Sequence, residues 1–273
     1  MTAISAIISN HCIAISSDSL LTIYNPSKRT NEIIESKKQK IVRVEKFLGA
    51  FSYWGLAANS RNGEKTMYKW LKKISNESKD FTTFEDFAYY VKDELKKEIA
   101  SYGIAKKHTG IGIHLVGYEN YEGYKIPELF LISNFTDPTY LKVGELGLSR
   151  CLFDNIPEEY KKNQSSITKI ERQLLVKKFL NEGNMFVFNN GDPKMFTPLF
   201  EGYKNAMNLS KQRKALRDAN NIEIYRNIAR RPIEMIIKVQ KDFYKEGKSI
   251  VGGRLHDLVI EKNNGNYSST SGV

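Results

Sequence analysis

Cysteine is scarce in this chain, which has only Cys12 and Cys151 among its 273 residues. Two cysteines are too few for a disulfide framework, and Cys12 falls in a predicted buried strand. We therefore expect a reducing, cytoplasmic setting. No basic stretch followed by an apolar one precedes the first predicted strand, so no secretory signal is expected.

Histidine and long apolar runs are also scarce. The four histidines are His11, His108, His114 and His256. They are not spaced as metal ligands are, so the sequence predicts no zinc site and no other cofactor. No apolar run approaches the length of a membrane span, so no membrane partner is expected. Hydrophobic residues still make up 41% of the chain, which is ample for the core of one large domain.

Acidic residues are fewer than basic ones, 31 against 42, and the formal net charge is +11. Such a charge is one mark of nucleic-acid-binding proteins. The lysines are spread along the chain, however, and the densest groups are SKKQK and KQRKALR. No aromatic-interleaved basic motif or helix-turn-helix signature accompanies them. Solvated surfaces explain these lysines more simply, so a nucleic-acid partner is not predicted.

A threonine stands directly after the initiator methionine. Thr2 is small enough for methionine aminopeptidase to remove Met1 and expose it. A terminal threonine carries a hydroxyl and a free amine, and an amine with a pKa of about 8 can act as general base for that hydroxyl. An internal threonine has no such base, because its nitrogen lies in a peptide bond. Thr2 is therefore a candidate nucleophile.

The first two predicted strands bring a carboxylate towards this threonine. Residues 2–9 and 12–17 are rich in β-branched residues, and Asn10 begins the turn between them. In an antiparallel hairpin centred on that turn, Asp18 is expected beside Thr2 to within one residue. A carboxylate there can hold a lysine ammonium, which lowers the pKa of the hydroxyl and stabilises developing negative charge.

These residues resemble the proteasome β-type threonine proteases and their bacterial relatives, which are N-terminal-nucleophile (Ntn) hydrolases. The matching segments are CIAISSDSLLT, KIVRV, GAFSYWGLAAN and, near the end of the chain, SIVGGRLHDLVIEK. The resemblance implies that Thr2 is the nucleophile and Asp18 its partner carboxylate. It also implies that Lys40 is the catalytic lysine and that the backbone N–H of Gly55 forms the oxyanion hole.

Some positions depart from the family pattern. The stretch before Lys40 is several residues longer than is usual, so Lys37 and Lys38 compete for the lysine role. Family members orient the terminal amine with an aspartate and, three residues later, a serine. The corresponding positions here hold Lys248 and Val251.

Two serines are weaker site candidates. Ser249 lies between the two departing positions, and Ser149 lies in GELGLS, which echoes a glycine- and serine-rich turn of the family. Both are also readily explained as ordinary polar residues. Asp18 likewise has a structural alternative, because an aspartate can cap a turn.

The remaining pattern predicts strands, two helices, strands, a helix and a closing strand. Strands are expected at residues 20–24, 40–44, 49–53, 110–118, 128–133, 140–143 and 255–261, with a polar loop at 25–36. Helices are expected around 67–74, 84–99 and 231–244, and a capping box from Thr82 to Glu85 opens the second. This order suits two sheets packed between helical layers. The resemblance implies that this α+β arrangement is the four-layer αββα sandwich of the Ntn hydrolases.

Residues 1–262 are expected to form a single domain, in which 157–221 is an insertion before the last helix that exceeds the family plan. A strong turn signal lies at 189–193. The insertion is either a loop over the substrate cleft or a subunit-contact or purely structural segment, and we favour the second. The tail at 263–273, NNGNYSSTSGV, is polar and expected to be disordered.

The sequence thus predicts a threonine peptidase that acts on peptides or proteins through an acyl-enzyme on Thr2. One alternative is an amidohydrolase acting on a small amide, since the same nucleophile serves both. Another is a structural ring subunit that has kept the fold and lost turnover, which Lys248 and Val251 favour. The resemblance further implies a ring-like homo-oligomer and leaves a partner ATPase open.

Overall fold

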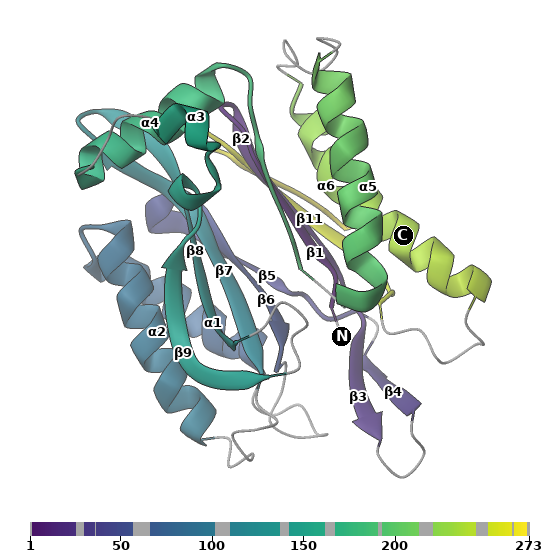
Figure 1. The fold of residues 1–273 in the computed structure, drawn as a ribbon. Coiled ribbons are helices and arrows are strands. Elements are labelled where there is room, and N and C mark those ends of the chain that lie inside the picture. The colour runs from purple at the N-terminus through teal and green to yellow at the C-terminus, as the bar shows by residue number, and fades with distance from the viewer. Residues whose placement is uncertain are drawn as a thin grey trace.

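The computed structural model describes residues 2–25, 30–35, 37–56, 66–101, 110–136, 142–161, 167–190, 193–212, 221–243, 251–263 and 265–271. Within these ranges the chain forms two five-stranded antiparallel sheets and a two-stranded hairpin (Figure 1). None of the helices in the described ranges is long and apolar enough to cross a membrane.

The first sheet begins just after Thr2. In spatial order its strands are β10 (Phe186–Asn190), β1 (Ile4–Ile8), β2 (Cys12–Asp18), β11 (Leu255–Glu261) and β12 (Tyr267–Ser271). The two opening strands, ISAII and CIAISSD, form because β-branched residues suit a pleated surface. Every residue of both strands is buried, so both of their faces are covered.

All strands of the second sheet come after β2 and before β10 in the sequence. In spatial order its strands are β5 (Ile41–Val44), β6 (Gly49–Gly55), β7 (Ile111–Tyr121), β8 (Tyr124–Phe135) and β9 (Val143–Arg150). Helices α1 (Met67–Glu77) and α2 (Phe84–Ser101) pack on one face of this sheet. Phe87 of α2, for example, lies 6.0 Å from Phe51 of β6 between ring centroids.

Helices α5 (Pro193–Gln212) and α6 (Ile222–Phe243) lie side by side against one face of the first sheet (Figure 1). Ile228 and Ala229 of α6 pack there against Ala14 and Val259. The other faces of both sheets contribute to one shared apolar cluster. Its members include Ile4, Ile15 and Leu258 from the first sheet and Ile41, Ala50, Trp54 and Val116 from the second. Helix α4 (Lys169–Asn181) follows the short α3 (Glu158–Lys161) and adds Val176 and Leu180 to this cluster.

The turn at Asn10 sets the register of β1 on β2. Ile4 lies opposite Ser17, which is one residue beyond the register that centring the hairpin on Asn10 predicts. Ala3 rather than Thr2 therefore faces Asp18, and the Asp18 N–H donates to the Ala3 carbonyl oxygen over 3.1 Å. The sequence placed Asp18 to within one residue, and the two-residue turn accounts for the difference.

The expected polar loop at 25–36 contains a strand. β3 (Leu21–Asn25) and β4 (Thr30–Glu35) pair as an antiparallel hairpin that projects from the end of the molecule where the N-terminus lies (Figure 1). The segment TNEIIE combines four polar residues with two isoleucines, so its composition did not predict a strand. Its pairing partner, rather than its own sequence, makes it a strand.

Three element boundaries also differ from expectation. The strand expected at 140–143 is β9, which begins only at Val143, and residues 140–141 lie outside the described ranges. Helix α6 begins at Ile222 rather than at 231, so Pro232 lies in its interior and not in its first turn. The cap of α2 is Thr83, whose Oγ1 accepts from the Asp86 N–H over 3.1 Å, one residue later than the expected box.

The segment 157–221 is built into the fold. Its strand β10 pairs with β1 from Ile4 opposite Asn190 to Ile8 opposite Phe186. It therefore supplies the strand beside the one that follows Thr2, and its helix α5 covers part of the first sheet. Of the turn expected at 189–193, residues 189 and 190 belong to β10 and residue 193 begins α5, while 191–192 lie outside the described residues.

The tail expected to be disordered contains β12, which pairs with β11 from His256 opposite Ser271 to Ile260 opposite Tyr267. The Tyr267 hydroxyl donates to the Val44 carbonyl oxygen in the second sheet over 3.0 Å. Polar residues suit this strand because it forms the edge of its sheet. Composition alone therefore suggested disorder where long-range pairing produces a strand.

Candidate active site

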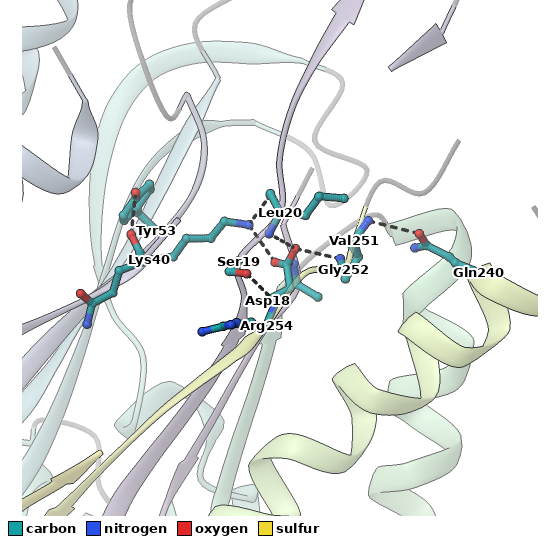
Figure 2. A network of polar contacts seen from close by, with 11 residues as sticks. Asp18, Ser19, Leu20, Lys40, Tyr53, Gln240, Val251, Gly252 and Arg254 are labelled. Atoms are coloured by element: carbon teal, nitrogen blue, oxygen red, sulfur yellow. Dashed lines mark hydrogen bonds and ion pairs between the residues drawn. The ribbon is translucent and has the colours of Figure 1, made fainter. Parts of the chain in front are cut away.

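Asp18 is the centre of a buried polar network. Its carboxylate Oδ1 accepts from Lys40 Nζ at 2.8 Å and from the Ala3 N–H at 2.9 Å. Its Oδ2 accepts from the N–H groups of Leu20 and Gly252, both at 3.2 Å. Four donors therefore hold the carboxylate in one orientation (Figure 2).

Lys40 directly precedes β5 and reaches from the second sheet to the first. Its Nζ also donates to the Leu20 carbonyl oxygen over 2.8 Å, and its side chain is 1% exposed. Burial lowers the pKa of Lys40 from its usual value, and the negative charge of Asp18 opposes that effect. Lys37 is exposed and Lys38 is half-buried, so Lys40 is the lysine that lies against the carboxylate.

The chain that leaves β2 is joined to the segment before β11. The Ser19 N–H donates to the Gly252 carbonyl oxygen over 3.1 Å, and the Arg254 N–H donates to Ser19 Oγ over 2.7 Å. On the other side, the Val251 N–H donates to Gln240 Oε1 of α6 over 3.2 Å (Figure 2). This network fixes the backbone around Asp18 through contacts between distant parts of the chain.

Thr2 adjoins this network through Ala3. It precedes β1 and is 7% exposed. The Asp18 oxygen that binds Lys40 thus also binds the peptide group linking Thr2 to Ala3. The structure brings the candidate carboxylate and lysine together. The candidate threonine is the residue directly before Ala3, whose N–H binds the same carboxylate.

Gly55 ends β6 with a φ of +84°, a conformation that favours glycine. A Cβ there would come within 2.3 Å of the Gly110 carbonyl oxygen. Glycine is therefore required at this turn whether or not its N–H group has a chemical role.

The remaining candidates are placed differently. Ser149 is exposed on β9, which lies at the opposite edge of the second sheet from β5. Ser249 and Lys248 lie outside the described residues. Val251 is buried, so an apolar side chain occupies the position that the sequence resemblance matches to the family's serine.

Sequence reasoning missed several contacts of this site. The backbone N–H groups of Leu20 and Gly252 bind Asp18. The only feature of the sequence that could have indicated these bonds is the glycine pair in SIVGGRL. A partly buried contact between His114 and Asn190 also lies near β1, and no local sequence pattern indicated it.

Two hollows flank β5, the strand that follows Lys40. A cavity of about 320 Å³ lies between β5 and the strands β11 and β12, and it is lined by Gln39, Ile41, Arg43, His256, Asp257, Leu258, Ser269 and Thr270. A larger hollow of about 880 Å³ lies between β5 and α1, with Tyr68 and Lys72 among its lining residues. Gln39, the neighbour of Lys40, lines both hollows, whereas Thr2, Asp18, Lys40 and Gly55 line neither.

The two antiparallel sheets with their helices give the chain a proteasome-like fold, as a solved structure supports. That structure is Anbu (ancestral beta-subunit) from Yersinia bercovieri, which matches with a TM-score of 0.55 over 99% of this chain and 86% of that chain. The match takes in the segment 157–221. At 10% identity the likeness concerns the fold alone. No family model and no curated protein match the chain.

Proposed function

We propose that this protein is a threonine-type peptidase of the proteasome-like Ntn hydrolases, with Thr2 as nucleophile once Met1 has been removed. The observation that carries the proposal is that one oxygen of Asp18 binds both Lys40 Nζ and the Ala3 N–H. This shared oxygen ties the lysine to the backbone next to Thr2. A buried lysine in that place can act on the hydroxyl without competition from solvent.

In the proposed reaction the free amine of Thr2 takes the proton of its own hydroxyl as Oγ attacks the peptide carbonyl carbon. Lys40 lowers the pKa of the hydroxyl, and the Gly55 N–H stabilises the oxyanion. The amine then gives the proton to the departing nitrogen, which leaves an ester on Thr2. Water hydrolyses this ester and restores the hydroxyl. Asp18 holds Lys40 in position throughout.

We further propose that residues 1–262 form one domain arranged as a four-layer αββα sandwich. The apolar cluster shared by the two sheets supports this arrangement, as do the helices on the outer face of each sheet. The segment after 262 completes the first sheet through β12. A cytoplasmic homo-oligomer is the proposed working form, and peptides or proteins are the proposed substrates.

One observation favours a second candidate, a structural subunit without turnover. Val251 puts an apolar side chain where the family uses a serine to orient the terminal amine, and its own N–H is bound to Gln240 Oε1. An amine that is poorly oriented is a weaker base for the hydroxyl. The two candidates differ in whether Thr2 reacts.

Intact-mass measurement before and after a hydroxyl-directed probe, an epoxyketone or a β-lactone, tests the proposal. The native protein should lack one methionine and should gain the mass of one probe. Thr2→Ala should abolish labelling and peptide turnover without changing the melting temperature much, whereas Thr2→Ser should keep partial activity because a hydroxyl beside a free amine remains.

Thr168→Ala is a matched control, since this internal threonine has no free amine and should leave labelling intact. Retained Met1, or equal turnover by Thr2→Ala and wild type, would contradict the peptidase. Cleavage of small amides but not of peptides would point to the amidohydrolase. Loss of Met1 without labelling or turnover would favour the structural subunit.

A further inference from the structure

His114 is a polar residue buried between the two sheets. It lies on β7, is 2% exposed, and faces the shared cluster to which Val116 and Tyr118 of the same strand belong. Its Nε2 lies 2.6 Å from Nδ2 of Asn190, the last residue of β10. An amide nitrogen is a donor, so Nε2 accepts and the ring proton lies on Nδ1. One side-chain hydrogen bond thus joins β7 of the second sheet to β10 of the first.

The ring is neutral under ordinary conditions. Burial lowers the pKa of His114 to about 4. The ring packs edge-on against Trp54, with 4.9 Å between centroids, and Trp54 directly precedes Gly55. Burying an imidazole in an apolar layer is unfavourable unless its nitrogens are hydrogen-bonded, and the half-buried Asn190 provides a partner for Nε2. The contact is therefore a specific link in a layer that apolar side chains otherwise fill.

This link and the Lys40–Asp18 pair lie on opposite sides of the candidate site. In the first sheet, β1 lies between β10, which ends in Asn190, and β2, which ends in Asp18. In the second sheet, β6 lies between β7, which carries His114, and β5, which Lys40 precedes. The strand after Thr2 and the strand that ends in Gly55 are thus each flanked by the same two bridges.

The strand registers put both bridges at one level. Ile4 of β1 lies opposite Asn190 on one side and opposite Ser17, the neighbour of Asp18, on the other. Ser52 of β6 lies opposite His114 on one side and opposite Ile41, the neighbour of Lys40, on the other. The sheets are therefore joined twice at the height of the site.

We propose that the hydrogen bond between His114 and Asn190 fixes the spacing of β1 and β6 across the site, so that both are positioning residues for the reaction of Thr2. The proposal rests on the proposed function. Without the bond, the Lys40–Asp18 pair holds the sheets from one side only, and β1 can shift relative to Gly55. A misplacement of about 1 Å at a reacting group can lower the rate of reaction about a hundred-fold.

The test compares variants that break the bond with one that keeps it. His114→Leu and Asn190→Ala should each lower kcat for peptide cleavage by about ten- to a hundred-fold, with KM within about two-fold of wild type. His114→Gln, whose side-chain carbonyl can still accept from Asn190, should recover most of kcat. The double variant should lose no more than the worse single variant.

Two matched controls share the surroundings without the bond. Tyr118→Phe removes a buried hydroxyl from the same face of β7, and Asn189→Ala removes the neighbouring amide of β10, which points to the other face. Both should leave kcat unchanged. Wild-type kcat in folded His114→Leu and Asn190→Ala would overturn the proposal, as would equal losses in the controls.

Amide hydrogen exchange tests the bridge independently of turnover. His114→Leu and Asn190→Ala should speed exchange in β1 and β6, and the two controls should not. Failure of the wild type to cleave or label would defeat the proposed function and leave this measurement standing. Unchanged exchange in both bond-breaking variants would defeat the bridge.

Discussion

At the scale of residues, the site depends on a charged pair that is removed from water. Lys40 and Asp18 are almost wholly buried, and they are held by each other and by backbone groups. Removing one partner of such a pair is strongly destabilising, by about 3–5 kcal/mol, because the other charge stays buried and unpaired. The same arrangement that orients Lys40 therefore makes it costly to replace.

Lysine substitutions test which ammonium matters. Lys40→Ala should abolish turnover and lower the free energy of unfolding by about 3–5 kcal/mol. Lys37→Ala and Lys38→Ala should change both quantities little, because Lys37 is exposed and Lys38 contributes a backbone N–H that the substitution retains. Peptide cleavage and urea unfolding of the three variants provide the measurement. Equal effects at all three positions would contradict the assignment.

His114 predicts a pH dependence of stability. Burial lowers its folded-state pKa to about 4, against 6.5 for the free side chain. Between these values the unfolded chain binds a proton that the folded chain does not, so this residue makes stability rise with pH over that window. The rise amounts to at most roughly 3–4 kcal/mol.

Urea unfolding of wild type and His114→Gln from pH 4 to pH 8 isolates this contribution. The difference between the two free energies of unfolding should change in favour of wild type up to about pH 6.5 and then stay constant. A difference that is flat across the whole range would show that His114 titrates as an exposed histidine does.

At the scale of elements, strands from distant parts of the chain complete the first sheet. β10 borders β1 on one side, and β11 and β12 extend the sheet beyond β2. The polar β12 contributes the Tyr267 hydroxyl bond to Val44 and the Ser268 hydroxyl that Arg226 of α6 contacts over 2.7 Å. The segment 263–273, which its composition predicted to be a disordered tail, therefore links the first sheet to the second sheet and to α6.

Truncation tests the contribution of β12. Ending the chain at residue 263 removes the strand, exposes the edge of β11 and should lower the melting temperature by roughly 5–10 °C, as a loss of a few kcal/mol does in a domain of this size. Ending it at residue 271 keeps the strand and serves as control. Equal melting temperatures for both truncations, measured by circular dichroism, would mean that the tail adds nothing.

At the scale of the whole molecule, two sheets share an apolar interior and meet at the candidate site through paired polar bridges. The proposed catalysis would require both sheets, because Thr2 precedes β1 and Asp18 ends β2 of the first sheet, whereas Lys40 precedes β5 and Gly55 ends β6 of the second. Motions between the sheets therefore bear directly on the proposed reaction. Contacts between subunits are one means of restricting such motions.

We predict that the chain assembles into a homo-oligomer. Light scattering of the purified chain should give a mass several times the 31.3 kDa of one subunit. The expectation follows from the proteasome-like fold and from the family resemblance of the sequence. The measurement should be made at moderate salt concentration. Each subunit carries a formal net charge of +11, and like charges repel most strongly at low ionic strength. A monomer throughout the micromolar range would contradict it.

Local sequence determined much of this protein. The periodicity of residues 2–17 predicted β1 and β2, the apolar spacing in 84–99 predicted α2, and the position of Thr2 after Met1 marked a candidate nucleophile. These features are visible because side-chain period and backbone propensity act over a few residues. Asp18 could be placed to within one residue for the same reason.

Tertiary structure decided the rest. It put Lys40 rather than Lys37 or Lys38 against Asp18, brought the Gly252 N–H to that carboxylate 234 positions away in sequence, and joined His114 to Asn190. It also made β12 a strand. Each of these outcomes depends on hydrogen bonds and burial between segments far apart in the chain, and such contacts leave no pattern in the local sequence of either partner.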